Sequence, residues 1–522
     1  MMRAGWASVG FAALVVAVAS CTSFEASPAV EPANSEGGIE AGQEDAGADV
    51  KRAEPSLHLT LTGPPRVMVG ESVELKVRVQ RDGAEGATGI VHVDLGSTPD
   101  ITAPAFDIPA DQSSATVTIA ASPNRKHGPI AFVVSAASPS LKGSAVYPLL
   151  VRGPAGSVDN GFGTDGVFTF TQASQATGLV VDAGRIFVGG RIGNDASILA
   201  LKSDGTLDGA FGAAGVYRAS VGTLLSTTEM VGSVAKGLFL GATVDSGTHP
   251  SAVLAAATAA GVRVPGFGVN GVAQVPLQTA TTLSLTPQGA ASPHGVLIGG
   301  RAVATSADSQ VALVQLDGTL NPTIGSGAVT SISNDCPGGG GNGNCLTRGL
   351  AAGTDASVVV VCAFRRDGSI VTGTDFEGKV SFDTLYTSLY IDTCTSLAYG
   401  KGKLYVGGNS GNVAAVSRYV NGTIDDTWPP GPAGQVGTPF APAGSNLILA
   451  KKIILQQDGT VVVASDATVG AHGAFGVWRL LPDGTTDKAF AAPNGYLTKT
   501  VGTSDIEVTT MGVDTEGRLV VA

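Results

Sequence analysis

The stretch DGTLDGAFGAAG, Asp204 to Gly215, contains the pattern on which most of the chain is built. A glycine is followed three residues later by a polar or acidic residue and six residues later by an apolar, mostly aromatic one. Similar stretches recur about every 55 residues, which indicates an internal repeat. We call these stretches the anchors, and their lead glycines are Gly156, Gly205, Gly261, Gly318, Gly378, Gly422 and Gly484.

A second recurring element lies between the anchors. It is an apolar strand that often ends in small residues, as in RIFVGG (185–190), VLIGG (296–300) and LYVGG (404–408). A turn and another apolar run precede it, so one repeat contains four strands. Small sheets of this kind bury both faces only against neighbouring sheets. Residues 153–522 are therefore predicted to form a seven-bladed β-propeller of four-stranded blades.

The anchors and the intervening strands resemble the delta-60 repeat family, whose signature is D-G-x-[LI]-D-x-x-F-G-x-x-G with an apolar strand midway between copies. The likeness covers roughly residues 156–522. It departs from the signature where Val264 replaces the acid and where EGKVSFDTL (377–385) loses both Asp and Phe, so the pattern does not fix the loops there. The resemblance implies a β-propeller-like fold, and function in that family is generally unassigned.

GFGTDG (161–166) and GFGVNG (266–271) have the G-x-G-x-x-G spacing of dinucleotide-binding loops. Such a loop needs a helix N-terminus after it, whereas the strand-like runs GVFTF and GVAQV follow here. We therefore interpret the acids as turn caps, the aromatic residues as plugs between blades and the glycines as positive-φ positions, and we predict no cofactor. These structural residues are Asp159, Phe162, Asp208, Phe211, Phe267, Asp425, Trp428, Asp487 and Phe490.

Residues 1–20 are predicted to be an export signal. Arg3 is basic, VGFAALVVAV (9–18) is apolar but too short to span a bilayer, and small residues follow. Val18-Ala19-Ser20-Cys21 resembles a bacterial lipobox, which implies cleavage before Cys21 and a lipid anchor on that cysteine. Thr22 in place of Asp implies an outer-membrane lipoprotein. An ordinary secretory signal is the alternative.

Two further regions precede the repeats. Residues 21–55 are rich in Ala, Glu, Pro, Gly and Ser, which predicts a disordered tether. Residues 56–152 contain short alternating runs such as VELKVRVQ (73–80), which predict a β-sandwich that resembles bacterial immunoglobulin-like modules in pattern only. The whole chain is thus expected to be all-β, a sandwich followed by a propeller.

The sequence allows two ways in which the ring of blades could close. The last repeat supplies three strands before Ala522. Ser144–Arg152 precedes the first anchor, where a further strand would stand, so it either completes the last blade or is the final strand of the sandwich. In the second case the seventh blade has three strands or the chain is truncated.

Four cysteines remain besides Cys21, and an even number in an exported chain predicts two disulfides. Cys336 and Cys345 enclose the flexible loop PGGGGNGN, which favours that pair, with Cys362 to Cys394 as the second; other connectivities stay open. No C-x-x-C pair is present, so we predict no metal site.

The charge balance argues against nucleic acid as a partner. The chain has 31 Lys and Arg against 43 Asp and Glu, a net charge of −12. Binding to phosphates needs a basic surface. Loops on a rigid scaffold often carry binding residues, and departures from the repeat single out Arg191, Arg301, Arg365 and Arg366 as candidates.

The chain shows no G-x-S-x-G or H-E-x-x-H motif. We therefore expect a surface-anchored outer-membrane lipoprotein whose propeller is a scaffold for binding an unknown protein or glycan, with no catalysis evident. The alternative is an extracellular hydrolase or lyase that acts on a glycan or lactone. Clustering of His249, His294 or His472 with carboxylates at one mouth of the ring would favour the enzyme.

Overall fold

The computed structural model describes two compact units, which we consider separately. The two-sheet unit is Cys21–Pro154, and the ring unit combines Met1–Ser20 with Ala155–Ala522. The described residues are 12–18, 56–82, 89–96, 98–285, 295–301, 309–321, 329–332, 346–352, 358–363, 369–374, 381–385, 393–410, 413–420, 423–428, 435–437, 450–469, 472–501, 506–514 and 517–522. Cys21 and the predicted tether lie outside them.

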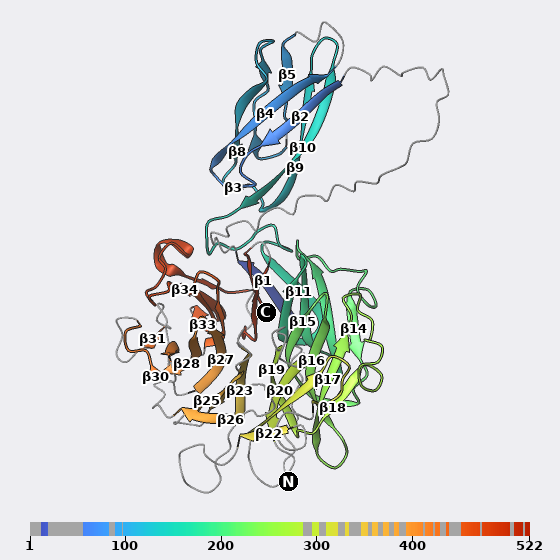
Figure 1. Cartoon of the computed structure of the whole chain (residues 1–522), viewed down its shortest axis with the longest axis vertical. Coiled ribbons are helices and arrows are strands. Elements are labelled where there is room, and N and C mark those ends of the chain that lie inside the picture. The colour runs from blue at the N-terminus through green and yellow to red at the C-terminus, as the bar shows by residue number, and fades with distance from the viewer. Residues whose placement is uncertain are drawn as a thin grey trace, which may run out of the picture. The chain divides into compact units, whose positions relative to one another are not determined.

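The predicted all-β class is confirmed, since strands dominate both units (Figure 1). Within the described ranges the one helical element is the short turn Ala491–Gly495. No helix in this part of the chain combines the length and apolarity needed to cross a membrane.

Two sheets enclose one hydrophobic core in the two-sheet unit. Residues alternate along β4, where Leu75, Val77 and Val79 are buried and their neighbours are exposed. The first sheet has the order β2 (Ser56–Thr62), β4 (Ser72–Asp82), β8 (Ser114–Ala121), β6 (Ile101–Thr102). The second has the order β3 (Arg66–Met68), β10 (Lys142–Arg152), β9 (Gly128–Ala137), β5 (Val91–Asp94), β7 (Phe106–Ile108).

Ser144–Arg152 belongs to this unit, so the alternative in which it completes the last blade is wrong. The segment lies in β10, which pairs antiparallel with β9 and parallel with β3. Its burial explains the placement. Tyr147 and Leu149 are buried whereas Val146 and Pro148 are exposed, and a strand covered on one face alternates in this way while a strand inside a blade is covered on both faces.

The ring unit consists of antiparallel sheets that follow one another along the chain (Figure 1). The first sheet contains the second half of β11 (Val167–Asp182), β12 (Arg185–Ile192), β13 (Asp195–Lys202) and β14 (Val216–Ala219). The second contains β15 (Thr223–Ser233), β16 (Gly237–Asp245), β17 (Pro250–Ala257) and β18 (Val272–Val275). The third contains β19 (Thr279–Leu285), β20 (Gly295–Arg301), β21 (Ser309–Gln315) and β22 (Val329–Ile332).

Three more sheets continue the series. The fourth contains β23 (Leu346–Ala352), β24 (Val358–Ala363), β25 (Ser369–Thr374) and β26 (Ser381–Leu385). The fifth contains β27 (Thr393–Gly400), β28 (Lys403–Ser410), β29 (Val413–Val420), β30 (Thr423–Ile424) and β31 (Gln435–Gly437). The sixth contains β32 (Ala450–Leu455), β33 (Val461–Val469), β34 (His472–Leu480) and β35 (Tyr496–Lys499).

The first strands of the sheets form a closed cycle. In order, β11, β15, β19, β23, β27, β32 and β36 (Met511–Val513) each contact the next, and β36 contacts β11. We call these the inner strands. The second and third strands of the second sheet, β16 and β17, are buried on both faces. Neighbouring sheets cover them, which explains why they read as continuous apolar runs in the sequence.

The sheet that joins the two ends of the cycle includes the segment predicted to be an export signal. β1 (Ala12–Val18) lies between β37 (Leu519–Val521) and the first half of β11, and it pairs antiparallel with both. The sheet order is β36, β37, β1, β11. When it is present, this segment is therefore a strand, because a short run of Ala, Leu and Val suits a buried strand as well as a signal.

The second to seventh anchors lead from the third strand of a sheet to its outer strand, whereas the first anchor follows β10 and precedes β11. In the second anchor the Asp208 N–H donates to the Ala200 carbonyl (2.9 Å), and the Phe211 N–H donates to the Asp208 carbonyl (2.9 Å). The third anchor keeps both bonds although Val264 replaces the acid, with distances of 3.2 and 3.3 Å. In the fifth copy, Ser381–Leu385 forms the outer strand β26 itself.

A backbone hydrogen bond joins successive anchors. The residue seven positions after one lead glycine donates its N–H to the carbonyl that precedes the next lead glycine. The described pairs are Gly163 with Asp204 (2.7 Å), Gly212 with Ala260 (2.9 Å), Gly268 with Asp317 (3.0 Å) and Ala491 with Ala155 (2.7 Å). The last pair links the seventh anchor to the first.

Replacing a lead glycine is expected to break one of these joints. Gly205 has φ +78°, and a Cβ there would lie 2.7 Å from the backbone nitrogen of Gly163. Gly205→Ala should therefore lower the free energy of unfolding by about 2 kcal/mol, because it combines a disfavoured φ with overpacking. Gly209→Ala, in the same turn with open space around it, is the matched control. Equal denaturant midpoints for the two variants would contradict this account.

Candidate functional site

The inner strands carry a β-bulge at equivalent positions. Register shifts in β11, β19, β27 and β32 each insert one extra residue into the inner strand, and these residues are Thr177, Thr281, Thr395 and Lys451. β15 has two shifts, and the one at the equivalent position lies between Thr227 and Met230. Bulges re-aim side chains and recur next to functional sites. The bulges therefore mark a common level inside the ring.

Most bulge side chains connect neighbouring sheets. Thr177 Oγ1 donates to the Thr228 carbonyl (2.6 Å), and Thr228 Oγ1 donates to the Thr281 carbonyl (2.7 Å). Thr395 Oγ1 donates to the Ala450 carbonyl in the same way. Hydroxyl groups at this level thus satisfy backbone carbonyls that the bulges release from the sheet ladders.

An ion pair spans the ring at this level. Lys452 Nζ on β32 lies 2.8 Å from Glu229 Oε1 on β15, and each side chain is 29% exposed. β15 contacts β11 and β19, while β32 contacts β27 and β36. The two charged residues therefore come from inner strands that are not neighbours in the cycle, and the pair lies across the interior of the ring.

Glu229 is held in its ionised form. Its second oxygen, Oε2, accepts from Thr282 Oγ1 (2.5 Å) and from the Leu283 N–H (3.0 Å). Burial would raise the pKa of this carboxyl, but the Lys452 ammonium and the hydrogen bonds together outweigh burial and lower the pKa. Both oxygens are occupied by donors, so Glu229 is a fixed charge and a poor general acid.

A second charged group adjoins the first. Lys451 Nζ lies 3.1 Å from Asp466 Oδ2 and 2.7 Å from Glu507 Oε1. Burial raises the pKa of Asp466, and this effect prevails over the opposing attraction of Lys451 and the hydrogen bond from the Val508 N–H. The pKa of Lys451 is also raised, because two carboxylates outweigh the effect of its burial. Perturbed titratable groups of this kind concentrate at functional sites.

The acids and aromatic residues of the anchors are bound within the scaffold. Asp159, Asp208, Asp425 and Asp487 each accept, through Oδ1, the N–H two residues later. Their Oδ2 atoms pair with Arg518, Arg185, Arg418 and Arg479 respectively. The aromatic residues Phe162, Phe211, Phe267, Trp428 and Phe490 are fully buried.

The arginine of this motif also contacts the next sheet. Arg185 Nη1 donates to the Ala259 carbonyl (2.5 Å), and Arg418 Nη1 donates to the Pro482 carbonyl (2.9 Å). Both carbonyls stand two residues before the lead glycine of the following anchor. The guanidinium of Arg418 also lies 5.0 Å from the Trp428 ring. One side chain thus ties its own anchor to the next.

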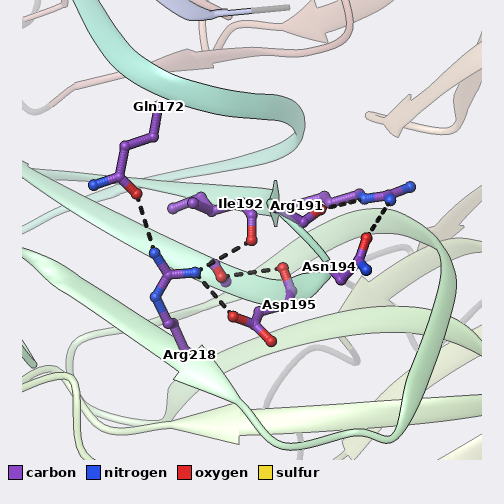
Figure 2. Close-up of polar contacts among 8 residues, drawn as sticks. Gln172, Arg191, Ile192, Asn194, Asp195 and Arg218 are labelled. Carbon is purple, nitrogen blue, oxygen red and sulfur yellow. Dashed lines mark hydrogen bonds and ion pairs between the residues drawn. The ribbon is translucent and has the colours of Figure 1, made fainter. Parts of the chain in front are cut away.

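Arg191 lies in an exposed polar group at the connection between β12 and β13 (Figure 2). Its Nε donates to the Gly193 carbonyl (2.6 Å) and its Nη2 to Asn194 Oδ1 (2.8 Å). Beside it, Arg218 Nη1 binds Asp195 (2.9 Å) and Arg218 Nη2 binds Gln172 (3.1 Å). Both guanidinium groups are held in position at the surface of the ring unit.

The structure describes the side chains of none of the other sequence-predicted arginines. Arg301 is the last residue of β20, and its side chain is not described. Arg365 and Arg366 lie outside the described residues.

The predicted disulfides stay predictions. Cys362 lies in β24 and Cys394 in β27, two strands of adjoining sheets that contact each other. The side chains of these two cysteines are not described, and Cys336 and Cys345 lie outside the described residues.

Among the described residues, the histidines do not form a catalytic cluster. His249 is at the β16–β17 connection, where its Nδ1 contacts the Pro250 carbonyl (2.9 Å). His472 begins β34, opposite Val469, and His294 lies outside the described residues. Over the part of the chain that is described, no three His, Cys, Asp or Glu side chains gather as metal ligands would.

Sequence analysis missed the charged pair inside the ring. The pair could have been suspected by aligning the inner strands. Glu229 and Lys452 occupy the position where other copies have Gly178, Thr282 or Ser396. A charge at a position that is small or hydroxylated in other repeats marks a departure from the scaffold. That alignment does not reveal that the two charges meet.

Comparison with known proteins supports the fold. A family described as "Domain of unknown function (DUF5122) beta-propeller" matches residues 456–490, which include β33 and the start of the seventh anchor. No curated protein matches the chain. Together with the cycle of inner strands, the family match supports the predicted β-propeller fold for the ring unit.

Similar solved structures share little sequence with the chain. A protein from Lactobacillus plantarum is 10% identical, with a TM-score of 0.36, over 71% of this chain and 95% of that one. The polysaccharide lyase Uly1 is 10% identical, with a TM-score of 0.29, over 67% and 85%. A titin M10 and obscurin-like 1 Ig complex is 20% identical, with a TM-score of 0.14, over 19% and 96%.

Removing the carboxylate of Glu229, which pairs with Lys452 across the ring, is expected to destabilise the ring unit. Glu229→Gln should lower the free energy of unfolding at pH 7 by about 2 kcal/mol, because Lys452 and two further donors lose a charged acceptor. The pKa of Glu229 is lower in the folded protein than in the unfolded chain. Its stabilising contribution is therefore present above about pH 4 and is lost as the pH falls further.

Denaturant unfolding of both proteins between pH 3 and pH 7 measures this difference. Lys452→Gln should lower the free energy of unfolding by less in the Glu229→Gln background than in the wild type, because the two residues interact directly. Additive effects, or a difference that persists unchanged at pH 3, would contradict the ion pair as its source.

Proposed function

We propose that the protein is a lipid-anchored binding protein of the outer membrane. In this proposal a seven-bladed propeller and an immunoglobulin-like sandwich follow a disordered tether, and the propeller binds a protein or glycan without catalysis. The cycle of seven inner strands supports the blade count, and the two sheets around one core support the sandwich. The lipobox-like sequence before Cys21 supports the anchor.

The observation that carries a binding role is the surface group around Arg191 and Arg218 (Figure 2). The turn between β12 and β13 fixes Arg191, and Asp195 and Gln172 fix Arg218, whose side chain remains 43% exposed. Pre-positioned guanidinium groups bind carboxylates with little further loss of side-chain entropy. A ligand that bears carboxylates, such as an acidic glycan, fits this chemistry.

The interior of the ring favours a scaffold over an enzyme. Glu229 is saturated by donors, and Lys451 is shared between Asp466 and Glu507. A general acid or base must be able to exchange a proton with a substrate. The Glu229–Lys452 pair instead braces two inner strands, which leaves binding to the outer surface.

The anchor is tested by replacing its cysteine. Wild-type protein should incorporate labelled palmitate and sediment with outer membranes, whereas Cys21→Ala should lose the label and become extractable without detergent. Cys362→Ala provides a control for loss of a cysteine elsewhere in the chain. Palmitate incorporation that survives in Cys21→Ala would contradict the anchor.

The binding face is tested with an acidic and a neutral polysaccharide. Titration calorimetry with polygalacturonate should show binding to the wild type, binding at least about tenfold weaker for Arg191→Ala with Arg218→Ala, and none for dextran. Arg263→Ala is the control, because Arg263 is exposed in the third anchor and donates to Asn270. Equal affinity of the double variant and the wild type would show that another surface binds.

A further inference from the structure

We infer that the processed protein has a strand-acceptor slot between β37 and β11 that takes an apolar, uncharged strand supplied from outside residues 21–522. In the full-length chain this position is occupied by β1. The inference rests on the proposed function, because cleavage before Cys21 removes β1. What remains are two strand edges that face each other across the width of one strand.

The backbone pairing defines the slot. On one side Val16, Ala17 and Val18 pair with Val521, Val520 and Leu519. On the other side Leu14, Val15 and Val16 pair with Thr169, Phe168 and Val167. Both pairings are antiparallel, so the occupant runs opposite to both neighbours. Removing it leaves unpaired N–H and C=O groups on both edges, a template that extended chains readily join.

The chemistry of the slot selects its occupant. Leu519, Val520 and Val521 are buried, and the occupying segment AALVVAV contains only small and β-branched or branched apolar residues. A charged residue here would be desolvated without a partner, which is costly. A seven-residue apolar segment with no proline therefore fits, whereas the acidic, proline-rich residues 22–55 do not.

The test uses a protein that begins at residue 21 with Cys21→Ala, so lipidation plays no part in it. A peptide of sequence AALVVAV flanked by lysines should bind this protein and raise its Tm. A control peptide with proline in place of the residue equivalent to Val16 should bind at least about tenfold more weakly, because that residue pairs on both sides. The full-length chain with Cys21→Ala, in which β1 fills the slot, should not bind the peptide.

Hydrogen exchange locates the binding. On addition of the peptide, amides of Leu519–Val521 and Val167–Thr169 should gain protection, and those of the two-sheet unit should not. Equal Tm for the shortened and full-length proteins, with no peptide binding, would overturn the slot. Equal binding of the two peptides, or protection elsewhere, would also overturn it. The palmitate experiment is separate, so failure of the anchor and failure of the slot are distinguishable.

Discussion

The structure of the ring unit depends on the hydrogen bond that joins one anchor to the next. Its donor is the residue seven positions after a lead glycine, and its acceptor precedes the following lead glycine. The two turns approach so closely that a Cβ on Gly156, Gly261 or Gly318 would lie 2.3 to 2.4 Å from the donor nitrogen. Glycine is therefore required at the lead position for two reasons, positive φ and close backbone approach. The lead glycine therefore recurs in every anchor because the hydrogen-bonded contact between successive anchors requires it.

Side chains reinforce the same joint. An arginine that is 7% exposed pairs with the anchor acid in Arg418–Asp425 and Arg479–Asp487, and Arg418 also reaches the next anchor. Because such a pair is largely desolvated, loss of one partner costs more than loss of both. The threonine hydroxyls at the bulges repeat this arrangement inside the ring. The first sheet is thus held to the second, and the second to the third, at two levels.

The sequence predicted what is local and repeated. The anchors and the apolar strands recur at readable spacing, so the all-β class and the propeller-like arrangement followed from them. The placement of Ser144–Arg152 did not, because an apolar run before the first anchor suits either unit until its one-sided burial is known. The strand formed by Ala12–Val18 was missed because its composition is that of an export signal. Glu229 and Lys452 are far apart in sequence, and only closure of the ring brings them together.

The charges inside the ring also bear on where a ligand can bind. The bulges of β11, β19 and β27 carry threonine, whereas β15 and β32 place opposite charges at this level. A pair that is partly shielded from water attracts more strongly than one at the surface, and here it bridges strands that no sheet connects. A ligand that entered the interior would have to separate these charges and replace three donors to Glu229. The surface group proposed to bind a ligand also contains an ion pair, Arg218–Asp195, but its side chains are 43% and 52% exposed, so opening it costs less than opening the pair inside the ring.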